Sequence, residues 1–177
     1  IFLRELSSND ADAIDKLRYE ALGTKDLDPF LDDPHLRIER DEEARTVTVS
    51  DTGVGMNRDE LRKFIGVIAK SGTKEYVSLI NEAKKAELPP ELIGQFGVGF
   101  YSTFMVSDKV TLTTRRAGDA EAWRWESTGD GTYSVAETEK ERPGTTVVCH
   151  LKDVDDDAGI GNYADEWTVR GIVTKYS

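Results

Sequence analysis

The chain has 177 residues and a mass of 19.7 kDa, with a formal net charge of −11 and a pI near 4.7. A chain of this length can bury a core of its own, and we expect residues 1–177 to form a single domain. The acidic balance argues against general affinity for nucleic acid or an anionic membrane, because both need a cationic protein surface.

The sequence carries few signals of its compartment. Cys149 is its only cysteine, which excludes an internal disulfide and fits a reducing compartment. No stretch approaches the roughly 20 apolar residues of a membrane-spanning helix, and no signal peptide precedes the first charges. Because Ile1 is not a methionine and the helical pattern starts at once, we expect a soluble fragment whose true N-terminus is missing.

Residues 2–22 predict an amphipathic helix. Its apolar residues fall within roughly 120° of one face; they are Phe2, Leu3, Leu6, Ala13, Ile14, Leu17 and Ala21. A polar stripe beside that face, suited to line a cleft, is formed by Glu5, Asn9, Asp12 and Lys16. Asp10 projects into the apolar face, and the sequence offers no reason for its position there.

Two segments with alternating polar and apolar residues, 36–40 and 46–50, flank a polar turn and predict a β-hairpin. Asp51 stands at the end of its second strand. A helix is predicted over 61–69, with residues 57–60 as its N-terminal cap region. Residues 71–92 mix a short helical pattern with a charged patch and two prolines, which is typical of a mobile lid.

The stretch from Gly94 to Ser102 holds three glycines within six residues, so its backbone can approach a ligand closely. Residues 100–106 predict a helix that follows it, and a helix N-terminus favours a bound phosphate. The spacing G-x-x-G-x-G matches neither the dinucleotide fingerprint nor the P-loop. A plain structural loop remains the alternative.

Strands are predicted over 109–115, 122–127, 133–138 and 145–151, joined by glycine-rich turns, and a terminal helix over 163–176. Runs of strands flanked by helices indicate an α+β fold with two layers.

The hexapeptide that begins at Asp51 places a carboxylate between a strand end and two glycines. Such a carboxylate can accept a hydrogen bond from an exocyclic amine such as that of adenine. Two alternatives remain: a simple Asp-Gly turn, and the Asp-Thr-Gly triplet of aspartic proteases. Because the triplet occurs once, a protease would need a symmetric dimer.

On the polar stripe of the first helix, Glu5 with Asn9 can pair a general base with a metal-binding amide oxygen, or both can be ordinary surface residues. Cys149 and His150 are neighbours on a strand, point to opposite faces and cannot form a catalytic dyad. We therefore expect Cys149 in the core. Two histidines and one cysteine give no zinc constellation.

Several motifs, taken together, resemble the N-terminal ATP-binding domain of the heat-shock protein 90 chaperones, with the bacterial or organellar branch nearest. They are the helical segment 1–19, D-T-G-V-G-M at 51–56, I-A-K-S-G-T-K at 68–74, I-G-Q-F-G-V-G-F-Y-S at 93–102 and P-G-T-T-V at 143–147. The resemblance implies a two-layer α/β sandwich in which helices cover one face of a mixed, mostly antiparallel sheet of about eight strands. ATP would lie between the sheet and the helices.

The resemblance also assigns roles to the site. Glu5 activates the attacking water, and Asn9 ligates Mg²⁺. Asp51 receives the adenine amine, with Gly55 and Thr145 completing that subsite. The residues that pack near the base are Met56 and Phe100. The phosphates are held by Lys70, Gly94, Gln95, Phe96, Gly97, Val98, Gly99 and Phe100, under a lid at about 70–94.

The implied protein is a cytoplasmic or organellar ATPase that binds ATP or ADP with Mg²⁺ and assists the folding of client proteins. Its middle and C-terminal domains would follow in the same chain and make it a homodimer, while this fragment alone would be monomeric and slow to hydrolyse ATP. Ser7, Asp10 and Phe64 depart from the family pattern. The rivals are a related ATPase of histidine-kinase, gyrase or mismatch-repair type, and a nucleotide-binding module without turnover.

Overall fold

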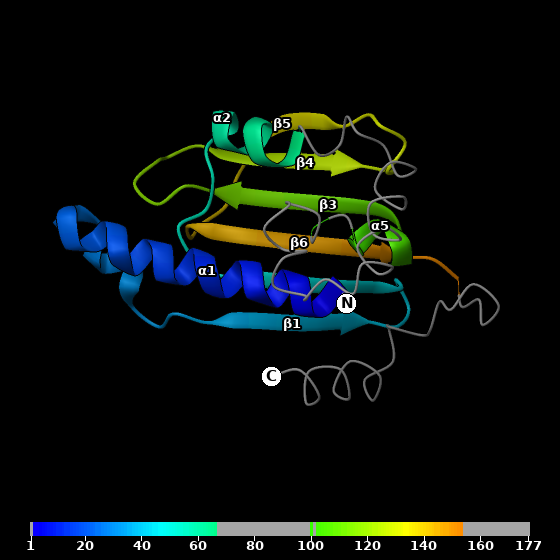
Figure 1. The fold of residues 1–177 in the computed structure, drawn as a ribbon, viewed down its shortest axis with the longest axis horizontal. Coiled ribbons are helices and arrows are strands. Elements are labelled where there is room, and N and C mark those ends of the chain that lie inside the picture. The colour runs from blue at the N-terminus through cyan, green and yellow to red at the C-terminus, as the bar shows by residue number, and fades with distance from the viewer. Residues whose placement is uncertain (1, 67–99, 101, 154–177) are drawn as a thin grey trace, which may run out of the picture.

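A six-stranded sheet is the frame of the computed structural model, which describes residues 2–66, 100 and 102–153 (Figure 1). The strands are β1 (Leu36–Asp41), β2 (Thr46–Asp51), β3 (Ser107–Arg115), β4 (Ala122–Ser127), β5 (Ser134–Thr138) and β6 (Gly144–Leu151). Their order in the sheet is β1-β2-β6-β3-β4-β5. Strand β6 therefore joins the hairpin β1-β2 to the meander β3-β4-β5, two units that lie far apart in the sequence.

The predicted α+β sandwich is confirmed, and its sheet differs in detail from the expected one. Within the described residues all five neighbouring pairs are antiparallel and six strands are present, where a mixed sheet of about eight was expected. Short turns connect β1 to β2, β3 to β4 and onward to β5, and such connections can join only antiparallel neighbours. Each strand lies within two residues of its predicted bounds.

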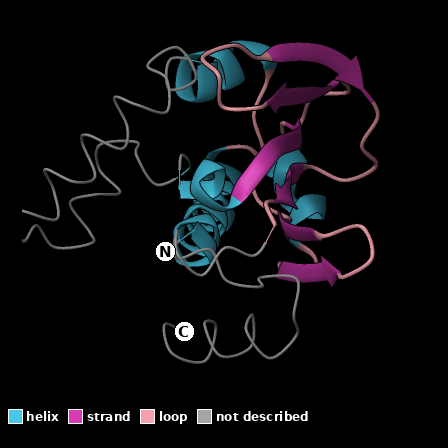
Figure 2. Cartoon of the chain, turned by 90° about the vertical axis from the view of Figure 1, so that its right-hand side faces the viewer, coloured by secondary structure: helices cyan, strands magenta, loops and turns pink. Residues whose placement is uncertain are grey.

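The long helix α1 (Phe2–Gly23) lies along one face of the sheet, as the two views at right angles show (Figures 1 and 2). Its buried residues include Leu3, Leu6 and Leu17, at the helical spacing that the sequence predicts. A 3-10 helix, Lys25–Leu31, follows α1 and was not predicted. The described part of the chain contains no helix long and apolar enough to cross a membrane.

Two shorter helices adjoin the same face. Helix α2 (Arg58–Leu61) begins with the predicted cap: the Glu60 N–H donates to Asn57 Oδ1 at 2.9 Å, and the Asn57 N–H donates to Glu60 Oε2 at 3.0 Å. The helix expected over 61–69 begins three residues earlier, at Arg58, and continues after Leu61 as a π-helix from Arg62 to Gly66. Residues 67–69 lie outside the described residues. Helix α5 (Ser102–Val106) confirms most of the helix expected over 100–106.

The core forms between α1 and rows of side chains that run across the strands. Val49 pairs with Val147, which pairs on its other side with Leu112, and Leu112 faces Trp125. All four are at most 3% exposed. Burial of this apolar surface supplies the main driving force that holds helix and sheet together.

The prediction of a core cysteine is confirmed. Cys149 is fully buried on the inward face of β6, and burial raises the pKa of its thiol to about 12. His150, the next residue, is only partly buried and contacts Thr111 at 3.4 Å. The two side chains therefore lie on opposite faces of the sheet, as expected.

Candidate functional site

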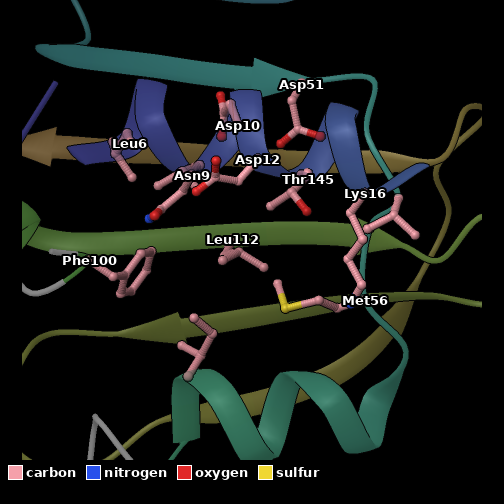
Figure 3. A pocket seen from close by; sticks show the side chains of 15 residues that line it. Leu6, Asn9, Asp10, Asp12, Lys16, Asp51, Met56, Phe100, Leu112 and Thr145 are labelled. Carbon is pink, nitrogen blue, oxygen red and sulfur yellow. The ribbon is translucent and has the colours of Figure 1, made fainter. Parts of the chain in front are cut away.

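A cavity of about 510 Å³ opens between α1 and the inward face of the sheet (Figure 3). This volume lies within the range of small-molecule and cofactor pockets. Its lining residues are Leu6, Asn9, Asp10, Asp12, Ala13, Lys16, Asp51, Val54, Gly55, Met56, Ile65, Phe100, Leu112, Thr145 and Val147. Figure 3 shows Asp51 and Thr145 near Asp10, with Phe100, Leu112 and Met56 in the more apolar part.

The polar end of the cavity forms where the inward-facing cross-strand pairs of the sheet change from apolar to polar residues. The row through Val147 and Leu112 is apolar, but the next inward row pairs Thr145 with Thr114. Asp51 lies beside Thr145, because β2 and β6 are antiparallel and their neighbouring residues Ser50 and Thr146 are cross-strand partners. The strand register thus places a carboxylate and two hydroxyls at the edge of an otherwise apolar face.

The loop that follows β2 is fastened on three sides. The Val54 N–H donates to the Ala13 carbonyl at 3.0 Å, which ties the loop to α1, and the Ala117 N–H donates to the Val54 carbonyl at 2.8 Å. The Met56 N–H donates to Thr114 Oγ1 at 2.9 Å. These bonds hold the lining residues at 54–56 in fixed positions against both layers.

Glycine is required at two places in this loop. A Cβ on Gly53 would lie 2.5 Å from the backbone of Ala13, so Gly53 lets the loop reach α1. Gly55 has a φ of +66°, and a Cβ there would lie 1.8 Å from the Arg115 carbonyl oxygen. The close approach excludes a Cβ at Gly55, and its positive φ would add backbone strain for any other residue.

Ion pairs of Arg116 also connect the elements around the site. Arg116, after β3, donates to both carboxylate oxygens of Glu20 on α1, at 3.0 and 2.9 Å. Its other terminal nitrogen is 3.3 Å from Glu60, which also caps α2. Because these side chains are only 20–28% exposed, the ion pairs are better shielded from water than a typical surface pair. They connect α1, which lines the cavity, to α2, which follows the lining residue Met56 in the chain.

Asp51 is 4% exposed, and its Oδ1 accepts a hydrogen bond from the Gly53 N–H at 2.7 Å. Asp10 of α1 is equally buried and is hydrogen-bonded to the Asp51 carboxyl group. Two ionised carboxylates in contact repel each other strongly, so the pair holds one proton between them. The second acid of this pair is Asp10, from the same chain. It does not belong to an Asp-Thr-Gly triplet, which the aspartic-protease interpretation requires of the partner of Asp51.

The surroundings decide which acid carries the proton. Burial and the neighbouring Asp51 raise the pKa of Asp10 to about 9. Burial also raises the pKa of Asp51, but the backbone N–H groups of Gly53 and Thr145 and the charge of Lys140 oppose that shift. Because these opposing groups act on Asp51 and not on Asp10, the proton that the pair shares is held mainly by Asp10.

Six residues of the predicted site line the cavity: Asn9, Asp51, Gly55, Met56, Phe100 and Thr145. Of the polar stripe on α1, the cavity includes Asn9, Asp12 and Lys16, but Glu5 is not among its lining residues. Glu5 is partly buried, and that burial raises the pKa of its carboxyl group, against the opposing charge of Arg4. Lys70, Gly94–Gly99 and the lid lie outside the described residues, as does the helix expected over 163–176.

Sequence reasoning missed the residues that act from behind the cavity wall. Thr114 is fully buried, accepts from Met56 and contacts Thr145 Oγ1 at 2.9 Å, so it positions two lining residues. Its place in an alternating strand marked it only as inward-facing. The sequence did mark Asp10 as a lone acid on an apolar helical face. Its contact with Asp51 could be identified only from the fold.

The sequence matches the family model for the histidine kinase-, DNA gyrase B- and HSP90-like ATPases over residues 31–156, and the chain belongs to this ATPase family. The match covers the cavity wall from β2 to β6.

Over its whole length the chain is also similar to the chaperone protein HtpG. It is 53% identical over 177 residues to HtpG of Salinispora arenicola, which is all of this chain and 28% of the relative. It is 53% identical over 176 residues to HtpG of Mycobacterium tuberculosis, which is 99% of this chain and 27% of the relative. The chain thus spans little more than a quarter of the length of these relatives.

These findings confirm the resemblance to the heat-shock protein 90 chaperones that the motifs indicated. Identity of this level along the entire chain favours the chaperone over the histidine-kinase and gyrase members of the same ATPase family. They also leave no support for the protease interpretation of Asp51.

We expect Gly55→Ala to destabilise the protein and weaken nucleotide binding. The new Cβ would collide with the Arg115 carbonyl oxygen and would impose a positive φ on an alanine. The positive φ alone should lower the free energy of unfolding by about 1–2 kcal/mol, and the collision should add to it. Urea unfolding and calorimetric titration with ADP measure the two effects.

Gly118→Ala is the matched control. Gly118 also has a positive φ, of +93°, but a Cβ there meets only a Leu27 methyl group at an ordinary 3.5 Å. This variant should lose stability through φ alone and should bind ADP as the wild type does. Equal losses of stability and affinity in both variants would contradict the close packing of Gly55.

Proposed function

We propose that residues 1–177 form a single domain, the ATP-binding and ATP-hydrolysing module of a molecular chaperone. The observation that carries the proposal is the buried carboxyl group of Asp51 at the polar end of a cavity whose other end is apolar. A flat aromatic base with an exocyclic amine complements such a site, because its rings bury apolar surface and its amine donates to the carboxylate.

Adenine is the base that we assign to this cavity. Asp51 accepts the exocyclic amine, Thr145 and Gly55 border the same end, and Met56 and Phe100 pack near the base and ribose. The rigid attachment of the loop at 54–56 supports this assignment, since a preorganised pocket loses little conformational entropy on binding. Phe100 is itself held in place by edge-to-face contacts with Trp125 and Phe104.

The phosphates of ATP or ADP and a Mg²⁺ ion would lie toward the exposed side of the cavity, near Asn9. Within the described residues no group of three acidic, histidine or cysteine side chains is placed to hold a metal alone. Mg²⁺ typically takes one or two protein oxygens and completes its shell with phosphates and water, and the Asn9 amide oxygen fits that requirement. When bound, the ion would neutralise phosphate charge.

Cationic and backbone groups must compensate the phosphates in a protein whose net charge is −11. Lys16 lines the cavity and is exposed. By their resemblance to the family motifs, Lys70 and the backbone from Gly94 to Phe100 are assigned to the phosphates, under a lid at about 70–94.

Glu5 is the general base that we assign to hydrolysis. It lies one helical turn before Asn9 on α1, and its raised pKa brings its carboxylate closer to the range in which a base is effective. Because Glu5 does not line the cavity, a module that binds ATP without hydrolysing it is the second candidate function.

The chaperone activity belongs to a longer chain. By analogy with HtpG, we propose that this module works with middle and C-terminal domains of the same chain, in a cytoplasmic homodimer that binds client proteins. Cycles of ATP binding and hydrolysis here would then drive changes in the attached domains.

Asp51→Asn should remove most of the affinity for ADP. The variant keeps the shape of the side chain but loses the charged acceptor, and a buried hydrogen bond to a charged group is worth on the order of 2 kcal/mol, or roughly thirtyfold in Kd. Calorimetric titration of the purified protein with ADP and Mg²⁺ measures the loss.

Asp15→Asn makes the same chemical change on an exposed part of α1 outside the cavity, and it should leave the affinity unchanged. Wild-type affinity in Asp51→Asn would refute the assignment of adenine to this cavity.

Glu5→Ala, made in the full-length chaperone, should keep ADP affinity and lose ATP turnover by about 10²-fold or more, because a general base acts mainly on the transition state. A steady-state ATPase assay and a parallel binding titration separate the two effects.

Glu5→Gln keeps the size of the side chain and removes its basicity, so it should lose turnover as fully as the alanine variant. If Glu5→Gln hydrolyses ATP at the wild-type rate, Glu5 is not the base. If no variant and no wild-type protein turns over ATP, the non-catalytic candidate is favoured.

A further inference from the structure

Asp10 occupies a position on α1 where the fold calls for an apolar side chain. It is 4% exposed and lies on the same helical face as the buried residues Leu6 and Leu17. A buried carboxyl group is costly unless its polar atoms are paired. A purely structural residue at this position would be apolar, so the acid invites a functional explanation.

The Asp10 carboxyl group is hydrogen-bonded to Asp51 and still has room for a further donor. Its Oδ2 is buried, and no described group donates a hydrogen bond to it. Both acids line the cavity, and Figure 3 shows them near each other at its polar end. The cavity therefore presents two acceptors next to each other: the Asp51 carboxylate and the unpaired Asp10 oxygen.

We infer that Asp10 is a second recognition residue for the nucleotide base, whose Oδ2 accepts one hydrogen of the exocyclic amine while Asp51 accepts the other. The inference rests on the proposed function, in which the base amine reaches Asp51. An unsubstituted amino group has two N–H donors, so it can satisfy both acceptors at once. Asp10 thus makes the pocket select a primary exocyclic amine.

Other charged groups do not supply this second contact. The charge of Lys140 acts on Asp51, and its ammonium is a donor that cannot accept from an amine. Asp12 and Lys16 line the cavity from α1 but are exposed, toward the side assigned to the phosphates. Among the acids that line the cavity, Asp10 and Asp51 are the two that are buried.

The test compares ADP with N6-methyl-ADP, in which a methyl group replaces one amine hydrogen. The wild-type full-length protein should bind ADP at least about tenfold more tightly than N6-methyl-ADP, because the methyl group removes one hydrogen bond and collides with Asp10.

In Asp10→Ala the truncated side chain leaves room for the methyl group. ADP affinity should fall about tenfold, and the preference for ADP over N6-methyl-ADP should shrink to threefold or less. Calorimetric titration in the presence of Mg²⁺ gives both constants.

Asp10→Asn is the matched control, since it keeps a carbonyl oxygen for the amine and an N–H group for Asp51. It should retain the wild-type preference within about threefold. An unchanged preference in Asp10→Ala, equal losses of affinity for both ligands, or loss of the preference in Asp10→Asn would each overturn the inference. A wild-type protein that binds neither ligand would instead refute the proposed nucleotide site.

Discussion

The site depends on the strand register at one end of the sheet. Because Ser50 pairs with Thr146 and Thr145 pairs with Thr114, the inward face changes from an apolar row to a polar one just where β2 ends. Asp51 is thereby buried beside a hydroxyl instead of being exposed in a turn. A shift of one residue would send the carboxylate to the outer face and bring the neighbouring side chains inward.

The remaining parts of the structure hold this end of the sheet against the helix. Val54 bonds to the Ala13 carbonyl of α1, and the absence of a side chain at Gly53 lets the two backbones meet. Arg116 adds ion pairs to Glu20 and Glu60 at the rim. The cavity is consequently built on rigid elements, which favours precise recognition of a ligand.

Much of the fold was predictable because it follows local periodicity. The alternation in β1 and β2 and the helical spacing in α1 are properties of short segments, and they placed Asp51 at a strand end correctly. The insertion of β6 between β2 and β3 is a long-range pairing that no local pattern encodes, so Thr145 entered the predicted site only through the family resemblance. For the same reason Asp10 was noticed as an anomaly but its contact with Asp51 was not foreseen. The departure from α-helix after Leu61 likewise escaped the sequence pattern.

The central claim is that the buried Asp51 carboxylate receives the amine of a base that lies between α1 and the sheet. A crystal structure of the protein with ADP and Mg²⁺ tests it most directly. The account predicts that the adenine amine nitrogen lies about 2.7–3.2 Å from an Asp51 carboxylate oxygen, with the rings against Met56 and Leu112. A base bound outside this cavity, or one that enters it with its amine turned away from Asp51, would contradict the account.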